Sequence, residues 1–361
     1  MKYLIILGTI ILLIPCVSAQ IYVPDNYPYI QWAVNNASEG DTIIVRDGFY
    51  NEYVHVLKSV TITSQNGSAN CKVGGFYVDA DGVTIDGFTI NGSMYGVYID
   101  GVESCGVYDM VIECSEYGIF IKNSMLCEIY NNTFLGNTYG ILLNSSTENS
   151  ITDNEFVGND HSIFLNNSSD NNIFGNYFER SKYYSILCKR SDSNYIEGNE
   201  FFRDNISVML KSSNYLSIDD NIFTNCNYSL HLTDSSYSEI YLNDFMDGPV
   251  YSSNSTNHWN TTVAYLYEYK GNQYVNYIGN HWSDYTGSDD NGDGIGDTPY
   301  TIDQHNVDHH PLIDSKDNYA IKFEASPTPT PTVSVPEYPA FASITATVCI
   351  LFVAARLLRI F

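Results

Sequence analysis

The sequence has few basic residues and a large excess of acidic ones. Its 361 residues include 16 Lys and Arg against 42 Asp and Glu, so the formal net charge is -26 at pH 7. A surface with this charge repels phosphate backbones and anionic lipid headgroups. Nucleic acids and anionic lipid surfaces are therefore disfavoured as partners.

Long apolar runs are confined to the two ends of the chain. Residues 1–19 read as a signal peptide, because Lys2 precedes an apolar run and Val17-Ser18-Ala19 forms a small-residue cleavage site. Asn-x-Ser/Thr sequons recur through the rest of the sequence, and on a secreted chain they are candidate glycan acceptors. The sequence thus predicts a secreted glycoprotein.

The C-terminal end predicts a membrane anchor. A Pro- and Thr-rich stalk is expected at residues 321–334, and residues 335–361 form a membrane or sorting tail. Within this tail the apolar stretch 340–355 is followed by Arg356 and Arg359, which are expected to stay on the cytoplasmic side. We therefore expect the protein at the cell surface, with its folded part outside.

The middle of the chain lacks helical periodicity and carries a repeat instead. The phrase Ile-x-x-Asn-x-Phe returns every 22 residues, with one step of 23, and a second apolar segment such as 140–143 follows each copy. Each repeat thus holds two short strands that cannot bury an apolar face alone, so successive repeats must stack as a parallel coil. The copies begin at Ile129, Ile151, Ile173, Ile196, Ile218 and Ile240.

The central Asn of each repeat is predicted to form a ladder. In a parallel coil, equivalent residues of neighbouring turns lie about 4.8 Å apart. An Asn amide at the bend can then bond to the Asn of the next turn. The ladder residues are Asn132, Asn154, Asn176, Asn199, Asn221 and Asn243.

The repeats also divide the folded part of the chain. Residues 20–82 are expected to form an N-terminal cap and the first turns, 83–250 the regular turns, and 251–320 a C-terminal closure. An amphipathic helix is predicted in the cap, where it can cover the open end of the coil. Its apolar residues are Ile30, Ala33, Val34 and Ala37.

Three segments together carry a resemblance to a known family. They are the opening 23–31, the repeats, and Asn280-His281-Trp282-Ser283-Asp284-Tyr285 running into 293–300. In these residues the chain resembles the NosD-like periplasmic copper-binding proteins, in the version common on archaeal cell surfaces. The resemblance implies an all-β, right-handed, single-stranded parallel β-helix of the pectin-lyase type. The tail is similar to archaeosortase-type sorting signals, with Pro336-Glu337-Tyr338-Pro339 where those signals usually have Pro-Glu-Phe-Pro.

An Asp-rich loop in the closure is the strongest candidate metal site. The spacing of its oxygen ligands matches positions 1, 3, 5, 7 and 9 of a calcium loop, although position 12 is Tyr300 rather than Glu. We expect a structural Ca²⁺ here; a simple Asp/Gly turn is the alternative. The ligands would be Asp289, Asn291, Asp293, Asp297 and the Ile295 carbonyl.

Copper, which the family name implies, has weaker support in the residues. His305, His309 and His310 follow the loop, with Asp303 and Asp308 among them. The Met residues are scattered, however, and no Cys/Met/His cluster of the kind that selects copper is present. A solvated His/Asp loop is the preferred interpretation.

The scarce basic residues gather in two turns. Arg180, Lys182, Arg190 and Arg203 fall there, beside an aromatic row that includes His161 and Tyr184. Rings stack on sugars and Arg pairs with carboxylates, so this region is a candidate groove for an acidic glycan. The plainer interpretation is that Tyr suits strands and that cations ease repulsion on an acidic coil. The row is Tyr95, Tyr117, Tyr139, His161, Tyr184 and Tyr228.

Two cysteines are one repeat apart. Cys105 and Cys127 should lie on neighbouring turns, about 4.8 Å from each other, which is within the range of a disulfide. Buried free thiols are the alternative, because thiols pack well as small apolar groups.

These features favour a surface β-helix with a binding or envelope-structural role, whose partners would be cell-envelope glycans or surface-layer proteins. The first rival is a polysaccharide lyase or epimerase that uses the region of Arg180 and Arg203 on acidic glycans; the second is a copper-delivery protein. Against the enzyme, the outward acids do not form three stacked ligands beside a basic residue. These acids are Asp86, Asp109, Asp153, Glu197, Asp219 and Asp220.

Overall fold

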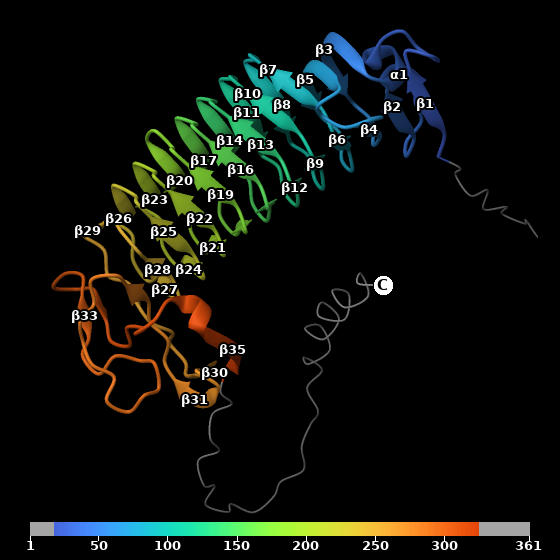
Figure 1. Cartoon of the computed structure of the whole chain (residues 1–361). Coiled ribbons are helices and arrows are strands. Elements are labelled where there is room, and N and C mark those ends of the chain that lie inside the picture. The colour runs from blue at the N-terminus through green and yellow to red at the C-terminus, as the bar shows by residue number, and fades with distance from the viewer. Residues whose placement is uncertain (1–17, 325–361) are drawn as a thin grey trace, which may run out of the picture. The chain divides into compact units, whose positions relative to one another are not determined.

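The computed structural model describes residues 18–324, which form a parallel β-coil with a cap at each end (Figure 1). Most of the predicted signal peptide and nearly all of the stalk and tail lie outside the described residues. Within residues 18–324 no helix is both long and apolar enough to cross a membrane. The anchor therefore stays a prediction.

Each regular turn contains three strands rather than the two expected from the sequence. In one turn these are β12 (Glu128–Tyr130), β13 (Thr133–Leu135) and β14 (Tyr139–Asn144). The repeated phrase is not one strand, because the chain bends between β12 and β13, where Asn131 takes a positive φ of 55°. The buried side chain of Asn132 then turns inward at the bend.

The first strands of the turns stack into an 11-stranded parallel sheet, called sheet A here. Its strands pair in register from turn to turn, as in Ile129 with Ile151. With β12, it contains β1 (Gln20–Val23), β2 (Thr42–Val45), β4 (Thr61–Ser64), β6 (Thr84–Asp86), β9 (Gly106–Tyr108), β15 (Ser150–Thr152), β18 (Asn172–Phe174), β21 (Tyr195–Glu197), β24 (Ser217–Asp219) and β27 (Glu239–Tyr241).

The second and third strands of the turns form two further rows within one 19-stranded sheet. The second row contains β13 with β7 (Thr89–Asn91), β10 (Val111–Glu113), β16 (Glu155–Val157), β19 (Tyr177–Glu179), β22 (Glu200–Phe202), β25 (Ile222–Thr224), β28 (Asp244–Phe245) and β32 (His281–Trp282). The third row contains β14 with β3 (Gly48–Val56), β5 (Cys71–Val78), β8 (Tyr95–Asp100), β11 (Tyr117–Lys122), β17 (His161–Asn166), β20 (Tyr184–Lys189), β23 (Ile206–Lys211), β26 (Tyr228–Thr233) and β29 (Val250–Ser253).

The interior is built from the ladders that the repeat predicts. The Phe rings of neighbouring turns stack with centroids 4.7 to 5.1 Å apart, from Phe134 to Phe245. The Asn ladder is confirmed: Asn132 Nδ2 donates to Asn154 Oδ1 at 3.0 Å, and the same bond recurs along the coil. Each buried amide is thereby satisfied, which is the condition for placing it inside.

The N-terminal cap is the predicted amphipathic helix, α1 (Ile30–Asn36). It buries Ile30, Ala33 and Val34 against the end of the coil. The Glu52 carboxylate accepts the first free N–H groups of the helix, from Ile30 and Gln31, at 3.0 Å each. A carboxylate at this end also suits the helix dipole.

The C-terminal closure continues the ladders with new residues. Asn243 Nδ2 donates to Asn280 Oδ1 at 2.9 Å, and Trp282 stacks on Phe245 at 4.4 Å. The closure contains a hairpin of β30 (Tyr265–Tyr269) and β31 (Asn272–Asn276), with β35 (Tyr319–Glu324) as a third antiparallel strand. The closure also holds β33 (Tyr300–Thr301), β34 (Val307–Asp308) and the 3₁₀ helix η1 (Lys316–Asn318).

The expected disulfide is not formed in the structure. Cys105 and Cys127 lie on adjacent turns, but both are buried free thiols. They occupy a corner that later turns fill with buried Asn149 and Asn171, and Cys127 N–H donates to Asn149 Oδ1 at 3.0 Å. The thiols thus pack as small side chains at an inward corner.

Candidate functional site

The outward side of the third strand row carries an aromatic surface. Two rows of half-exposed side chains run along it through β8, β11, β14, β17, β20, β23 and β26, and we call this surface the aromatic face. The first row is Tyr95, Tyr117, Tyr139, His161, Tyr184, Ile206 and Tyr228; the second is Tyr98, Phe120, Leu142, Phe164, Leu187, Met209 and His231.

The rings of the first row stack on one another. From Tyr95 to Tyr184, neighbouring centroids are 5.0 to 5.4 Å apart and the planes are within 20° of parallel. Ile206 interrupts the predicted ladder between Tyr184 and Tyr228. Because neighbouring rings cover each other's faces, a ligand here would meet ring edges and hydroxyl groups rather than open faces.

The predicted basic groove is divided between two edges of the aromatic face. Arg180 and Arg203 lie in one ladder, since Arg180 N–H donates to the Phe202 carbonyl at 3.1 Å, directly before Arg203. Lys182 is on the same edge, whereas Arg190 follows β20 at the opposite end of a six-residue strand. A strand of this length separates the two edges by about 16 Å.

Several of the predicted groove residues already have partners. Arg180 pairs with Glu179 at 2.8 Å, and Lys182 pairs with Asp160 at 3.1 Å. Arg203 lies over the Phe202 ring, with its guanidinium carbon 4.5 Å from the centroid.

His161 is the one imidazole ring in the first row of the aromatic face. Its ring stacks on Tyr184 with the centroids 5.4 Å apart. Burial lowers the pKa of His161, so that it contributes an uncharged ring.

The Asp-rich loop in the closure folds around its own amides. Asp289 accepts N–H bonds from Gly292, Asp293 and Gly294 at 2.8 to 3.1 Å. Asp293 Oδ1 accepts the Ile295 N–H at 2.8 Å, and Asp297 Oδ2 accepts a further loop amide at 2.7 Å. No group of three or more His, Cys, Asp or Glu in residues 18–324 is arranged to hold a metal ion. Calcium at Asp289, Asn291, Asp293, Ile295 and Asp297 stays a prediction.

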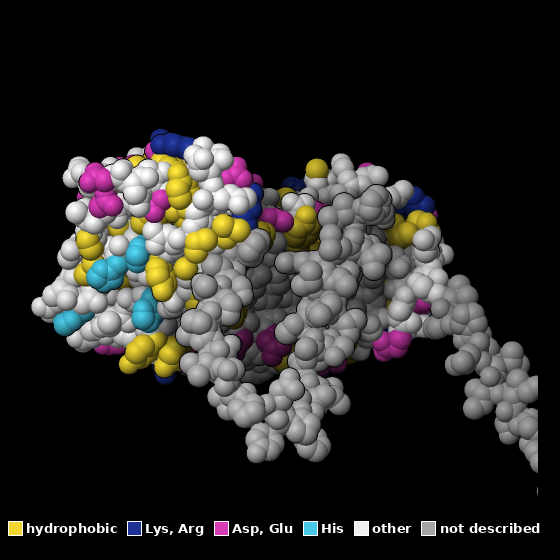
Figure 2. Space-filling model, turned by 90° about the horizontal axis from the view of Figure 1, so that it is seen from below, with side chains coloured by type: hydrophobic (Ala, Val, Ile, Leu, Met, Phe, Trp, Pro, Cys, Tyr) yellow, Lys and Arg dark blue, Asp and Glu magenta, His cyan; other side chains and the backbone are white. Residues whose placement is uncertain are grey.

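The histidines of the closure do not converge on one point. Figure 2 shows histidine side chains at several places on the surface of the C-terminal end, among hydrophobic side chains. His310 packs on Tyr277 with centroids 5.1 Å apart, and burial lowers its pKa. Asp308, fully buried, accepts bonds from Asn280 N–H at 2.8 Å and Trp282 Nε1 at 3.0 Å. This carboxylate therefore holds the closure together rather than facing a metal.

A cavity of about 320 Å³ lies on the outer side of sheet A, where the closure packs against it. Three acidic side chains line it, together with aromatic and apolar ones. We call this cavity the carboxylate cleft. It is lined by Glu197, Asp219, Asp220, Tyr241, Leu242, Thr261, Tyr265, Ile278, Tyr319 and Ile321.

The acids of the carboxylate cleft come from neighbouring turns. Asp219 of β24 is in register with Glu197 of β21 on one side and with Tyr241 of β27 on the other. Burial, together with the charges of Glu197 and Asp220, raises the pKa of Asp219 to about 7, against a hydrogen bond from Ser217 Oγ at 2.7 Å. Such a carboxyl can give or take a proton near neutral pH.

A buried lysine pairs with one acid of this cleft. Lys316 Nζ lies 2.7 Å from Asp220 and 3.3 Å from Asp317. Burial disfavours its charge, but these acids outweigh burial and raise the pKa of Lys316. Lys316 contacts Asp220 alone among the outward acids of the described residues, so the expectation that these acids do not form three stacked ligands beside a basic residue stays a prediction, although this contact was not expected. The repeats could not show it, because Lys316 lies 96 residues after Asp220.

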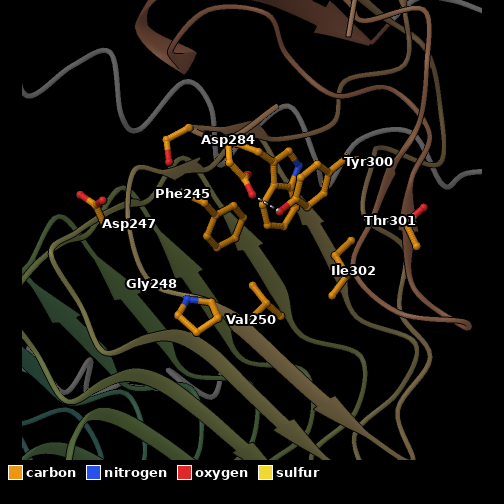
Figure 3. A pocket seen from close by; sticks show the side chains of 11 residues that line it. Phe245, Asp247, Gly248, Val250, Asp284, Tyr300, Thr301 and Ile302 are labelled. Atoms are coloured by element: carbon orange, nitrogen blue, oxygen red, sulfur yellow. Dashed lines mark hydrogen bonds between the residues drawn. The ribbon is translucent and has the colours of Figure 1, made fainter. Parts of the chain in front are cut away.

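A second cavity of about 440 Å³ lies at the C-terminal end of the Phe ladder (Figure 3). Trp282 is sandwiched between Phe245 at 4.4 Å and Tyr300 at 4.2 Å, and Tyr300 Oη donates to Asp284 Oδ2 at 3.3 Å. Figure 3 shows Asp284 beside Tyr300, with Asp247 apart from both. Both faces of the Trp282 ring are therefore covered, and the cavity marks the end of the core stack. Its two acids, Asp247 and Asp284, do not form a pair.

Comparison with known proteins identifies the family. The family described as periplasmic copper-binding protein (NosD) matches residues 34–208 and 179–287, more than half of the sequence. The chain belongs to the NosD family. A NosD-like right-handed parallel β-helix is thereby confirmed, and a periplasmic family is consistent with secretion. The closure histidines, however, do not form a set that fits copper.

Solved structures confirm the fold without showing an activity. ORF18 of Geobacillus virus E2 is 17% identical, with a TM-score of 0.56 over 66% of this chain and 60% of its own. The Streptococcus pneumoniae surface adhesin PfbA is 11% identical, with 0.52 over 72% and 99%. A mannuronic acid specific family 6 polysaccharide lyase from human gut microbiota is 14% identical, with 0.50 over 65% and 77%. This NosD-family chain thus spans about 60% of the viral protein. No curated protein matches it.

Proposed function

We propose that this protein is a secreted, surface-held β-helix that binds glycans of the cell envelope on its aromatic face. The observation that carries the proposal is the contrast between this face and the rest of the molecule. Two uncharged, half-exposed rows extend over seven strands of a protein whose formal charge is -26. An extended apolar strip of this kind is unusual on a soluble surface and suits a ligand.

The shape of the aromatic face favours a chain-like ligand. Equivalent side chains recur at each turn, about 4.8 Å apart, so the same contact is offered repeatedly along the coil. The Tyr hydroxyls at the ring edges can donate and accept hydrogen bonds, as sugar hydroxyls require.

The cations select where an acidic sugar would lie. Arg180, Lys182 and Arg203 stand at one edge of β20 and β23, and Arg190 with Lys189 stands at the other. A carboxylated chain that crosses these two turns would meet positive charge on both sides, and Tyr184 and His161 beneath it. We propose this crossing as the preferred site for an acidic residue of the glycan.

The remaining parts of the proposal concern placement on the cell. The tail 335–361 would hold the chain in the membrane, with the stalk carrying the coil outward. A structural Ca²⁺ in the loop 289–297 would rigidify the closure near the stalk. Surface-layer proteins are the alternative partners for the same face.

A glycan array with the secreted chain tests this function. Retention of acidic glycans is expected, and the double change Lys182→Ala with Arg203→Ala should weaken it about ten-fold or more. Lys72→Ala removes an exposed cation from β5, far from this edge, and serves as the matched control. If no glycan is retained, or if Lys72→Ala weakens retention as much as the double change does, the aromatic face is not the glycan-binding surface.

An enzyme acting on glycans is the second candidate, favoured by the carboxylate cleft rather than by the basic edge. Asp219, with its pKa raised to about 7, could serve as a proton donor or acceptor beside Glu197. Release of new reducing ends or unsaturated uronates from array hits would support it. Unchanged release by Asp219→Asn would exclude this cleft as the source.

A further inference from the structure

The outer side of sheet A has a second hollow beside the carboxylate cleft. The cleft is lined by the last residues of β21, β24 and β27, whereas this hollow of about 410 Å³ lies at their first residues and at the corner before them. We call it the tyrosine pocket. The side chains that matter here are Tyr195, Tyr215, Tyr237, Ser217, Glu239 and His258.

The pocket exists because one small residue separates two large ones. Tyr195, Ser217 and Glu239 are in register on successive turns. Tyr195 and Glu239 are therefore two rungs apart, about 9.6 Å along the coil, and the Ser217 side chain fills little of the space between them. The Ser217 hydroxyl donates to Asp219 at 2.7 Å. A gap of this width accepts one sugar ring with van der Waals contact on both sides.

Tyrosines gather at this corner only in the two turns that form the pocket. The residue two places before each sheet A strand has a positive φ, up to Tyr215 and Tyr237. A large side chain is unfavourable in this backbone conformation, and these two rings are 60% and 61% exposed, so burial returns little. Packing within the coil therefore does not explain them. The earlier turns have Ser104, Leu126, Glu148, Asp170 and Ser193 at this place.

Ring faces are available in the tyrosine pocket, unlike on the aromatic face. Tyr215 and Tyr237 stack with their centroids 5.3 Å apart, and neither has another ring neighbour among residues 18–324. Tyr195, 54% exposed, has no ring neighbour within the same described residues. Each of the three rings thus keeps at least one face that no other ring covers, and a sugar ring can stack on such a face.

The polar groups of the pocket favour a ligand that is rich in hydroxyl donors. Glu239 Oε1 accepts the Thr262 N–H at 3.2 Å, which fixes the carboxylate and leaves acceptor capacity for a ligand. His258 pairs with Glu239 on the next rung and lines the same pocket. Proline-rich peptides also bind aromatic grooves, but they present carbonyl acceptors to a carboxylate that accepts as well. The same carboxylate disfavours an acidic sugar, so a neutral sugar fits best.

We propose that the tyrosine pocket binds one residue of a neutral glycan, which lies above Ser217 between Tyr195 and Glu239, beside the stacked pair Tyr215 and Tyr237. This is a second binding site, on a different side of the coil from the aromatic face and for a different class of glycan. It depends neither on the binding of acidic glycans by the aromatic face nor on catalysis in the carboxylate cleft.

The test is calorimetric titration of the secreted chain at pH 7 with neutral hexaoses of glucose, mannose and galactose, and with a mannuronate hexaose. At least one neutral hexaose should bind, and Tyr195→Ala and Tyr215→Ala should each weaken that binding about ten-fold or more. Ser217→Gln should weaken it as strongly, because the longer side chain fills the pocket. Any binding of the mannuronate hexaose should be the same in these variants as in the parent.

The matched control is Tyr130→Ala. Tyr130 is an exposed tyrosine on β12, three turns before Tyr195, so its loss should leave the affinity for the neutral hexaose unchanged. Thermal unfolding checks that each variant is folded. Ser217→Gln is expected to fold, because Glu128 and Asn172 occupy the same register position in earlier turns.

Three results would overturn the proposal. One is that none of the neutral hexaoses binds. Another is binding that none of the pocket variants weakens, or that Tyr130→Ala weakens as much as they do. The last is binding of a proline-rich peptide that Tyr195→Ala abolishes while no neutral hexaose binds, because the partner of the pocket would then be a protein.

Discussion

The buried carboxylate of Asp204 should make the coil more stable at low pH than at high pH. Asp204 occupies an inward corner that earlier turns fill with Asn137 and Asn159. Its Oδ1 accepts the Ser181 N–H at 2.7 Å, but its Oδ2 has no hydrogen-bond partner among the described residues. Burial raises its pKa to about 6, although the bond from Ser181 N–H acts in the opposite direction.

The size of the effect follows from the shift. A rise from 3.8 to about 6 is about 2.2 pKa units, and at 1.36 kcal/mol each this is about 3 kcal/mol. Because the folded pKa lies above the unfolded one, the folded state binds the proton more tightly. The stabilising contribution is present below about pH 4 and is lost as the pH rises through about 6.

The change Asp204→Asn should remove this penalty and fit the existing ladder. Asn159 Nδ2 donates to the Phe134 carbonyl at 2.9 Å, and an Asn at 204 would place its Nδ2 toward the corresponding Phe178 carbonyl. We expect the free energy of unfolding at pH 8 to rise by up to about 3 kcal/mol. At pH 4 little should change, since Asp204 is already neutral in the folded state.

Chemical unfolding at pH 4, 6 and 8, followed by circular dichroism, measures this difference. Asp153→Asn is the control, because this exposed acid should give nearly equal stabilities to the parent at each pH. A gain that is the same at pH 4 and pH 8, or a loss at pH 8, would refute the reasoning about Asp204.

Three further predictions concern the ladders, the thiols and the loop. Asn176→Ala should lower the free energy of unfolding by about 3 kcal/mol, because it orphans the buried Asn154 N–H and removes one partner each from Asn154 Nδ2 and the Ile151 carbonyl; destabilisation below about 1 kcal/mol in chemical unfolding would contradict this. Native maleimide labelling should modify the exposed Cys114 and leave Cys127 unmodified until unfolding, whereas a Cys127 that stays unlabelled in denaturant without reductant would indicate a disulfide. Removal of calcium by a chelator should lower the melting temperature of the parent protein, and Asp289→Asn should abolish that response. A melting temperature of the parent that the chelator does not change would show that the loop holds no structural calcium.

The regular coil could be predicted from the sequence because its physics is local and repeated. The side chains of Ile129, Asn132 and Phe134 are buried, and the equivalent side chain in each turn has the same surroundings. The repeat pattern alone therefore identifies the residues that face the interior of the coil. The missed third strand has a plain reason. The pattern predicts a bend at Asn132 but does not show that this bend separates two strands. The reason is that the positive φ of Asn131 is not visible in a single sequence.

The candidate sites were harder to predict because they depend on contacts between distant segments. The aromatic row was foreseen from its spacing, but the mutual covering of its rings requires the stacking distances, such as 5.2 Å between Tyr117 and Tyr139. The carboxylate cleft needs Lys316 and Tyr265 from the closure to meet Asp219 and Asp220 of the coil. No repeat predicts where an irregular closure folds back.

Hydroxyl-radical footprinting of the secreted chain, with and without a retained acidic glycan, tests the central claim most directly. The proposed function predicts that bound glycan protects Met209, Tyr184 and Phe164 of the aromatic face from oxidation. Phe49 of β3, 73% exposed and outside the aromatic face, should be oxidised equally in both samples. Protection of Tyr241 and Tyr265 instead, or of none of the aromatic face, would contradict the claim that this face is the glycan-binding surface.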